Sequence, residues 1–341
     1  MVKVFVTGVT GYIGGDAFYA LNKAHPEWEF SALVRNAEKG KQVTDVYPKA
    51  RTVVGDLDSY DLLVKEAAAT DIIVHTADSS DHEGASKAFA EGLAKHTKKK
   101  PGYWLHCGGT GILTYFDSSA GKFGDPSDKE FNDWNGVDEL TNLPHEAFHR
   151  NVDEIVLGCG KEHPDNVKVA LVCPPTIYGK GRGPSHTRSR QAYELVKATL
   201  RLKSGPILGE GKARWNNVHV YDLSNAFLLL AEAAVAGKND KGMWGGDVYY
   251  LCENGEHVWG ELSKLVAKTA ADLGFIPEAK TEKMDEAKAK DVAGFESLSW
   301  GYNSRGKAER LNKILGWVPK EHSIEEEIPI IVKSENEALK K

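Results

Sequence analysis

Near its start the chain reads Val4-Phe5-Val6-Thr7-Gly8-Val9-Thr10-Gly11-Tyr12-Ile13-Gly14, which combines an apolar strand, a glycine turn and the start of a helix. Gly8 permits the tight turn, Gly11 lets the backbone approach a pyrophosphate, and Gly14 lets the helix pack closely on the strand. The helix N-terminus then presents free N–H groups and a partial positive charge to the phosphates. This segment therefore predicts a dinucleotide-binding loop.

The next strand end bears on the choice of cofactor. About 20 residues past the last glycine, where an NAD-specific site carries an acid for the ribose hydroxyls, the chain reads Ala32-Leu33-Val34-Arg35-Asn36 and holds no acid. The Arg35 guanidinium, with Lys39 and Lys41 following, suits a 2′-phosphate through bidentate, charge-assisted hydrogen bonds. We therefore expect NADP(H) to be favoured over NAD(H). The alternative is that Arg35 is an ordinary exposed residue at a strand end.

Short β-rich apolar runs alternate with helical patterns over residues 1–175. This alternation is typical of an α/β fold, a doubly wound parallel Rossmann sheet with helices on both faces. The looser pattern that follows predicts a smaller C-terminal substrate lobe. We expect the nucleotide-binding domain to comprise residues 1–175 plus about 213–252, and the substrate lobe to comprise about 176–212 and 253–341.

The individual elements follow from the same periodicities. Strands are predicted near Val2–Thr7, Trp28–Val34, Thr52–Val54, Asp71–Thr76, Tyr103–Cys107, Val167–Cys173 and Asp247–Leu251. In the second half, helices are predicted near Arg188–Leu202, Val258–Leu273, Ser304–Leu315 and Ser323–Val332, with a strand-helix unit over Trp215–Val235.

Composition excludes several classes of protein. Of 341 residues, 41% are hydrophobic and 27% are charged, as in globular proteins. The net charge of -6 gives no basic field for nucleic acid, and no apolar run is long enough to predict a membrane span. The 4 cysteines are scattered and form no Cys-x-x-Cys motif, which favours a reducing compartment and a cytoplasmic location.

Further motifs follow in order along nearly the whole chain. They are Gly55-Asp56-Leu57, Val74-His75-Thr76-Ala77, Cys173-Pro174-Pro175-Thr176-Ile177-Tyr178-Gly179, Asn217-Val218-His219-Val220-Tyr221-Asp222-Leu223 and Leu315-Gly316-Trp317-Val318-Pro319. With the glycine spacing, they resemble the extended short-chain dehydrogenase/reductase family, which includes NAD-dependent epimerases and dehydratases. The resemblance implies a cofactor site made of Gly8, Thr10, Gly11, Tyr12, Ile13, Gly14, Arg35, Asp56, Leu57, Thr76, Ala77, Pro174, Thr176 and Ile177.

The catalytic residues of that family are missing. Its chemistry uses a Tyr as general acid/base, a Lys four residues later, and a Ser or Thr at the end of the fifth strand. The helix expected to carry the first two reads Pro144 to Glu154, with His145 at the Tyr position and His149 at the Lys position. That spacing would put both side chains on one helix face. Gly109 stands at the Ser position, with Thr110 next to it.

Two main explanations stay open. The histidines can replace the Tyr/Lys pair, since imidazole titrates near neutrality, with His145 as proton donor, His149 near the ribose and Thr110 polarising a carbonyl. Alternatively, the site keeps the cofactor without redox chemistry, which resembles the nicotinamide-nucleotide-sensing regulators of nitrogen metabolite repression. We prefer the enzyme, because the segments on the substrate side are rich in polar and aromatic residues.

A third explanation is a metal-dependent hydrolase, because residues 145–149 spell His-Glu-x-x-His. On a helix, this motif binds Zn²⁺ through its two histidines and uses the Glu to activate water. No Gly-x-x-His follows, Arg150 comes directly after, and Pro144 marks a helix start. We therefore expect no metal.

The sequence thus favours an atypical NADP(H)-binding oxidoreductase, or an epimerase/dehydratase-like enzyme, acting on a small carbonyl or hydroxyl compound. Arg182, Arg188 and Arg190 could hold an anionic substrate. The family resemblance implies a homodimer. The expected substrate contacts are Asp78, Tyr115, Tyr178, Arg188 and Trp215.

Overall fold

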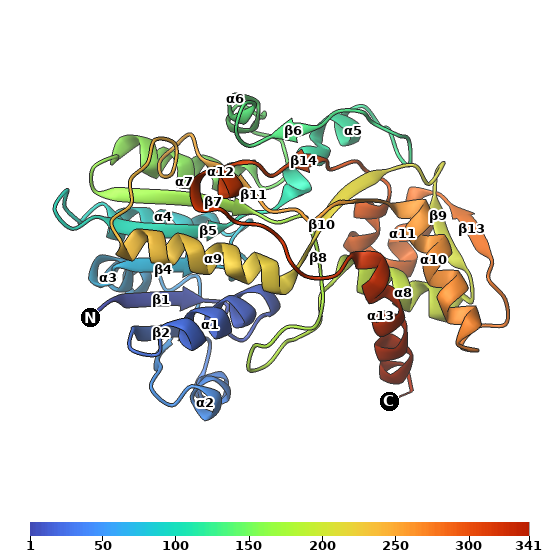
Figure 1. The fold of residues 1–341 in the computed structure, drawn as a ribbon, viewed down its shortest axis with the longest axis horizontal. Helices are drawn as coiled ribbons and strands as arrows, with labels where there is room; N and C mark the ends of the chain where they lie inside the picture. Colours follow the sequence, from blue (N-terminus) through green and yellow to red (C-terminus); the bar gives the residue numbers. More distant parts are fainter. Residues whose placement is uncertain (341) are drawn as a thin grey trace.

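The structure is a computed structural model that describes residues 1–340. Its first half alternates strands and helices, as the sequence periodicity predicts (Figure 1). The elements are β1 (Lys3–Thr7), α1 (Tyr12–Ala24), β2 (Glu29–Val34), α2 (Ala37–Val46), β3 (Arg51–Val54), α3 (Tyr60–Ala69), β4 (Ile72–His75), α4 (Glu83–Leu93), β5 (Gly102–Cys107), η1 (Thr110–Thr114), α5 (Tyr115–Ser119), β6 (Phe131–Asn132), α6 (Val137–Thr141), α7 (Arg150–Glu162) and β7 (Val167–Cys173).

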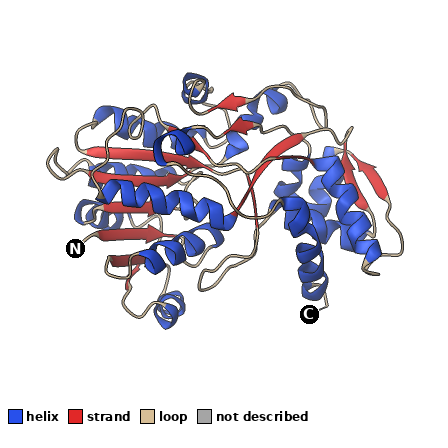
Figure 2. Ribbon diagram, in the orientation of Figure 1, coloured by secondary structure: helices blue, strands red, loops and turns tan. Residues whose placement is uncertain are grey.

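The second half has shorter strands and longer helices (Figure 2). Its elements are β8 (Thr176–Tyr178), α8 (Gln191–Leu202), β9 (Gly205–Leu208), β10 (Arg214–His219), α9 (Val220–Val235), β11 (Tyr249–Leu251), β12 (Glu256–Val258), α10 (Trp259–Asp272), β13 (Thr281–Met284), α11 (Glu286–Ala293), η2 (Gly294–Trp300), β14 (Gly306–Lys307), α12 (Arg310–Leu315) and α13 (Ile324–Ala338).

A seven-stranded parallel sheet forms the centre of the first half, in the order β11-β7-β5-β4-β1-β2-β3. The chain runs outward from β1 to β3 and then returns to β4 on the other side of β1. Such a reversal opens a crevice at the carboxyl ends of the two central strands, here β1 and β4. The doubly wound fold predicted from the sequence is therefore confirmed, and the crevice lies where the glycine turn follows β1.

Side chains alternate between the two faces of this sheet, as the pleat requires. Val4 and Val6 of β1 pack under α1 and α9, whereas Phe5 packs on the opposite face under α3 and α4. On the neighbouring strand, Val74 and Ile73 divide in the same way. Both faces of the sheet are covered by helices, which explains why its strands are apolar nearly throughout.

The second lobe has a core of its own, formed by α8, α10 and α13 around Trp259 and Trp300. Its elements lie to the right in Figure 1, with the small β9-β13 sheet at their edge. β8 and β10 pair with each other between the lobes. No helix within residues 1–340 is long and apolar enough to cross a membrane.

The segment over Ser304–Leu315 differs from the sequence prediction. The helix expected over Ser304–Leu315 is helical only in α12, because tertiary pairing takes the residues before it. The Ser304 hydroxyl donates to the Thr110 carbonyl at 2.6 Å, and the Gly306 N–H donates to the Asn216 side chain at 2.5 Å. β14 then pairs with β6, so this late segment lies against the first half of the chain.

Candidate active site

A single large cavity of about 1070 Å³ opens at the carboxyl ends of the parallel strands. Its walls come from the turns after β1, β2, β4 and β5, from the segment after β7, and from η2 of the second lobe. One end contains the glycine loop. The other contains a histidine, a threonine and several aromatic side chains.

The glycine loop has the backbone geometry that close packing requires. Gly8 has a φ of +80°, and a Cβ on Gly14 would lie 2.5 Å from the Gly8 carbonyl oxygen and 2.2 Å from the Thr76 hydroxyl. α1 begins directly after Gly11, and no side chain caps it. Its first N–H groups therefore lack intrahelical partners and face the cavity with the positive end of the helix dipole. This end fits the pyrophosphate of a dinucleotide.

A threonine pair fixes β1 to β4 at the base of the loop. The Thr76 hydroxyl donates to the Thr7 carbonyl at 2.7 Å, and the Thr7 hydroxyl accepts from the Thr76 N–H at 3.1 Å. The Thr7 hydroxyl also contacts His75 Nδ1 at 2.7 Å. Burial holds the pKa of His75 well below its ordinary value, so this ring is neutral and structural.

Arg35 follows β2 at the same end of the cavity as the glycine loop. Its side chain is exposed and lines the wall. The two lysines expected to assist it point elsewhere, because Lys39 donates to Gln42 and Lys41 pairs with Asp45 on α2. The Ser59 hydroxyl lowers the pKa of nearby Asp56. Arg35 is thus an exposed cation at this end of the cavity.

Nearly all residues expected to bind the cofactor lie in the cavity wall. Thr176 does not, since it is fully buried and its hydroxyl has no hydrogen-bond partner. The residues in the wall are Gly8, Thr10, Gly11, Tyr12, Ile13, Gly14, Arg35, Asp56, Leu57, Thr76, Ala77, Pro174 and Ile177.

His149 stands at the opposite end of the cavity, in the cap position just before α7. Its φ is 71°, a left-handed conformation that is uncommon for a residue with a side chain. Nδ1 lies 2.7 Å from Oδ1 of Asp81. Nε2 faces the loop after β5, since a Cβ on Gly111 would lie 3.3 Å from it and one on Gly109 3.5 Å. The ring is thus oriented by a carboxylate and points toward the loop that carries Thr110.

Thr110 is buried at the wall and is held from two sides. Its hydroxyl accepts a hydrogen bond from Trp215 Nε1 at 3.2 Å, and its backbone carbonyl accepts from Ser304. Because the indole occupies one acceptor position, the hydroxyl proton stays available for another oxygen. Thr110 can therefore donate a hydrogen bond to an oxygen atom in the cavity.

The prediction of one helix carrying both histidines is wrong. Residues 144–148 form turns, and α7 begins only at Arg150. The His145 side chain is 68% exposed, does not line the cavity, and contacts Glu154 at 2.7 Å. Glu154 raises its pKa. The two histidines therefore do not face each other across a helical turn, which removes the geometry of the zinc motif and the expected role of His145 as proton donor.

The expected substrate residues divide in the same way. Asp78, Trp215 and Arg188 line the cavity, whereas Tyr115 and Tyr178 do not. Tyr178 is fully buried, and its hydroxyl donates to the His322 carbonyl at 2.5 Å.

The three arginines expected to hold an anionic substrate are all paired with acids. Arg182 pairs with buried Asp16 of α1 and lies outside the cavity, so its prediction is not supported. Arg188 pairs with Glu335, and Arg190 with Glu296. These partners are distant in the sequence, and no local pattern reveals them.

Sequence reasoning also missed residues that the fold brings to the cavity. Asp81 lies 68 residues from His149, and only its position just after β4 hints at a role. Phe148 and Phe295 come from the two lobes and meet with ring centroids 5.5 Å apart. The sequence signal that could have identified the two phenylalanines is an aromatic residue in a segment expected to form turns, because such residues often lie at binding sites.

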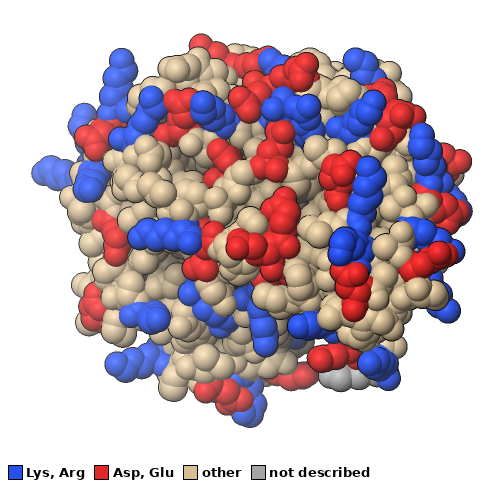
Figure 3. Space-filling model, turned by 45° about the vertical axis from the view of Figure 1, so that its right-hand side comes forward, with Lys and Arg blue, Asp and Glu red and all other residues tan. Residues whose placement is uncertain are grey.

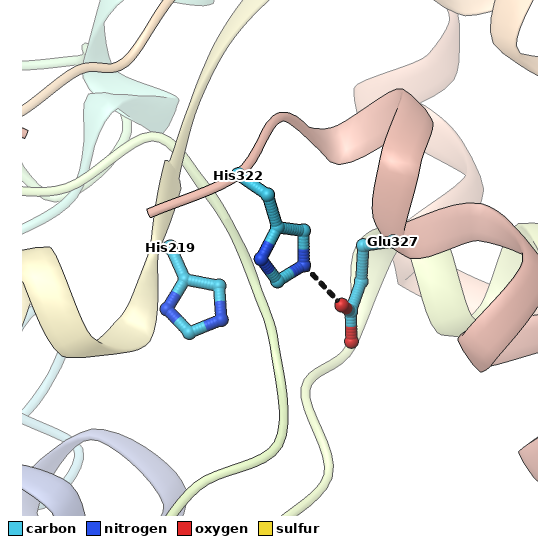
Figure 4. Close-up of side chains that lie close together, drawn as sticks. All are labelled: His219, His322 and Glu327. Atoms are coloured by element: carbon cyan, nitrogen blue, oxygen red, sulfur yellow. Dashed lines mark hydrogen bonds and ion pairs between the residues drawn. The ribbon is translucent and has the colours of Figure 1, made fainter. Parts of the chain in front are cut away.

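Outside the cavity, His219, His322 and Glu327 bring one ligand atom each within 4.8 Å of one another, the single such group within residues 1–340 (Figure 4). His219 Nδ1 accepts from the Tyr221 N–H at 3.1 Å, which leaves the ring proton on Nε2. His322 Nε2 lies 2.5 Å from Glu327. A metal ion bound here would have to replace the hydrogen bond that each ring makes.

Charged side chains are mixed over the face seen in Figure 3, with acidic and basic groups interspersed. This face therefore shows no large patch of one charge, in agreement with the small net charge of -6.

Comparisons with known proteins agree with this geometry. A protein of Acremonium sp named oxidase ucsJ is 39% identical over 343 residues, which cover 99% of this chain and 98% of that protein. The structure of the dTDP-glucose 4,6-dehydratase DesIV from Streptomyces venezuelae with NAD and TYD bound superimposes with a TM-score of 0.66 at 18% identity, covering 98% of this chain and 97% of that one. UDP-glucose 4-epimerase from Thermotoga maritima with UDP-glucose gives 0.64 at 16% identity, covering 98% and 99%.

The family model described as "NAD dependent epimerase/dehydratase family" matches residues 4–246, the segment that contains the glycine loop, Thr110 and His149. The chain therefore belongs to the NAD dependent epimerase/dehydratase family.

Proposed function

We propose that this protein is an NADP(H)-dependent oxidoreductase that interconverts a carbonyl and a hydroxyl group on a small molecule, with His149 as its proton-transfer residue. The observation that carries the proposal is the His149–Asp81 pair, which shares one cavity with the glycine loop and points at the segment bearing Thr110. The name of the Acremonium relative, an oxidase, supports a redox reaction.

The bound dinucleotide would donate or accept the hydride. The chain's residues supply the rest. The Thr110 hydroxyl, fixed by Trp215, donates to the substrate oxygen and orients it. His149 Nε2 gives a proton to that oxygen in reduction and takes it back in oxidation, while Asp81 holds Nδ1 and stabilises the protonated ring. The carboxylate sets the ring orientation, as in other acid–histidine pairs.

The preference for NADP(H) rests on Arg35. This guanidinium lines the cavity, is exposed, and has no acid competing for it among the pairs within residues 1–340. A 2′-phosphate would gain a charge-assisted hydrogen bond there that a ribose hydroxyl lacks.

A two-step experiment tests the function. The purified protein is titrated with NADPH and NADH, and the NADPH complex is then mixed with a panel of ketones and aldehydes while cofactor absorbance is followed. We expect tighter binding of NADPH and its oxidation by at least one carbonyl class. Binding without oxidation of the cofactor across the panel would favour the nucleotide-sensing role instead, and equal binding of both cofactors would overturn the NADP(H) preference.

A further inference from the structure

Both arginines at the substrate end of the cavity are paired with acids. The arginines that line it are Arg188 and Arg190, both from the segment before α8. Arg188 contacts Glu335 at 2.7 Å and Glu194 at 2.8 Å, and the Glu335 side chain is only 4% exposed. Arg190 contacts Glu296 at 2.5 Å. Each guanidinium group is therefore already paired with a carboxylate, and Glu296 is the one of these acids that lines the cavity.

The second lobe adds no compensating charge to this wall. The side chains that η2 and the turn after it contribute are Phe295, Glu296, Leu298, Ser299 and Tyr302. Glu296 is the one charged group among them. A nucleoside diphosphate would have to compete with these carboxylates for the guanidinium groups of Arg188 and Arg190.

Aromatic rings form the rim of the same end. Phe148 precedes His149 in the first half of the chain, Phe295 belongs to η2, and both are exposed although they contact each other. The Phe148 ring lies against the His149 ring, with centroids 3.6 Å apart. Trp215 closes the wall beside Thr110. An apolar molecule packed against the two phenylalanines would therefore lie next to both proposed catalytic side chains.

From these observations we infer that the substrate is an uncharged, mainly apolar carbonyl or hydroxyl compound with a ring, held against the exposed Phe148–Phe295 pair, and not a nucleotide-linked sugar. This inference rests on the proposed function and narrows its substrate class. Burial of exposed aromatic surface supplies the binding free energy, while the paired arginines maintain the lobe rather than recognise phosphate.

Calorimetric titration of the NADPH complex tests the inference, with 2-tetralone as the apolar ring ketone and UDP-glucose as the nucleotide sugar. We expect saturable binding of 2-tetralone and none of UDP-glucose. Saturable binding of UDP-glucose, or failure of 2-tetralone to bind to the NADPH complex, would overturn the inference. The proposed function is judged separately by cofactor binding and oxidation, so its failure is visible before either probe is added.

Two variants sharpen the test. Phe295→Asp, at a side chain 60% exposed, should weaken 2-tetralone binding about tenfold by removing apolar contact, with NADPH affinity unchanged. The matched control is Ile330→Asp, an exposed apolar residue of α13 outside the cavity, which should leave both affinities intact. An equal loss in both variants, or none in Phe295→Asp, would contradict the placement of the substrate.

Glu296→Gln examines the charge argument independently. This variant removes the carboxylate that pairs with Arg190, so affinity of the NADPH complex, in which the glycine loop is occupied, for inorganic pyrophosphate should rise at least about tenfold over that of the unmodified chain. No rise would mean that the paired acids are not what excludes phosphate from this end.

Discussion

At one end of the cavity, the glycine loop and Thr76 form a site from two short segments at the ends of neighbouring strands. At the other end, Asp81, Thr110, His149, Trp215 and Phe295 come from five separate segments and both lobes. The first end keeps the pattern by which the family is recognised, whereas the second lacks the family's Tyr and Lys. The two ends are built from different parts of the chain, so we expect changes at one end to leave the other working.

The largest effect is expected from His149→Asn. Asparagine tolerates the left-handed backbone that this position has, so the fold is kept while the titrating ring is lost. Turnover measured by NADPH oxidation should fall by roughly 10²–10⁴-fold, with NADPH affinity unchanged. His145→Asn is the matched control and should keep nearly full activity, because its side chain is outside the cavity. Similar losses in both would restore the role first expected of His145.

Gly14→Val breaks the opposite end. Its Cβ would lie within 2.5 Å of the Gly8 carbonyl oxygen, so the loop must shift away from the pyrophosphate position. NADPH affinity measured by fluorescence titration should fall at least about 100-fold. As a control, Gly158→Ala adds a methyl group where nothing lies within 4 Å, in the middle of α7, and should raise the free energy of unfolding by up to about 1 kcal/mol. Retained binding in Gly14→Val would contradict the assignment of the phosphate end.

Asp81→Asn has an intermediate effect on the catalytic end. The amide keeps the shape but loses the charge that orients His149 and stabilises its protonated form. We expect kcat to fall about 10- to 100-fold, with KM and NADPH affinity little changed. Unchanged kcat would show that the contact at 2.7 Å is structural only.

Arg35→Ala should change selectivity alone. Loss of one charge-assisted hydrogen bond to a 2′-phosphate should weaken NADPH binding about tenfold and leave NADH binding unchanged. Lys41→Ala, at a lysine paired with Asp45, provides the control and should alter neither affinity. Equal losses of affinity for NADPH and NADH in Arg35→Ala would mean that the guanidinium does not distinguish the two cofactors.

The last prediction concerns the free energy of unfolding rather than turnover or cofactor affinity. Burial raises the pKa of Asp153, which lies beneath the catalytic end, to about 6. Between its unfolded pKa near 3.9 and this value, the unfolded chain binds fewer protons than the folded one, so this group lowers the free energy of unfolding as pH rises. In Asp153→Asn that dependence disappears, and the stability difference between the two proteins should shift by about 3 kcal/mol from about pH 4 to about pH 7. Denaturant unfolding at both pH values checks the shift, and an unchanged difference would show that Asp153 is not protonated in the folded state.

Local patterns were enough for the sheet and for the phosphate end. β1 and the glycine turn follow from apolar alternation and from the need for small residues where backbones touch, so the predicted and observed positions agree. Only part of the proposed catalytic end could be predicted from the sequence. His149 was named, but the spacing of two histidines suggested a helix, whereas the chain makes turns and a left-handed residue before α7 begins.

The partners of these residues depend on the fold rather than on the sequence pattern. Asp81 meets His149, and Glu335 meets Arg188, only because separate elements pack together. From the sequence alone, Arg188 suggests a binding site for an anion. The structure shows that Arg188 is instead paired with the buried carboxylate of Glu335.

The central claim is that the two ends of the cavity act together to move hydride and proton at one carbonyl. It is tested most directly by a single turnover of the protein loaded with NADPH deuterated at C4, using the ketone that the panel shows to react fastest. The account predicts deuterium on the former carbonyl carbon of the product, formed at the same position but far more slowly by His149→Asn. Tight NADPH binding with no deuterium transferred to any ketone of the panel would contradict it.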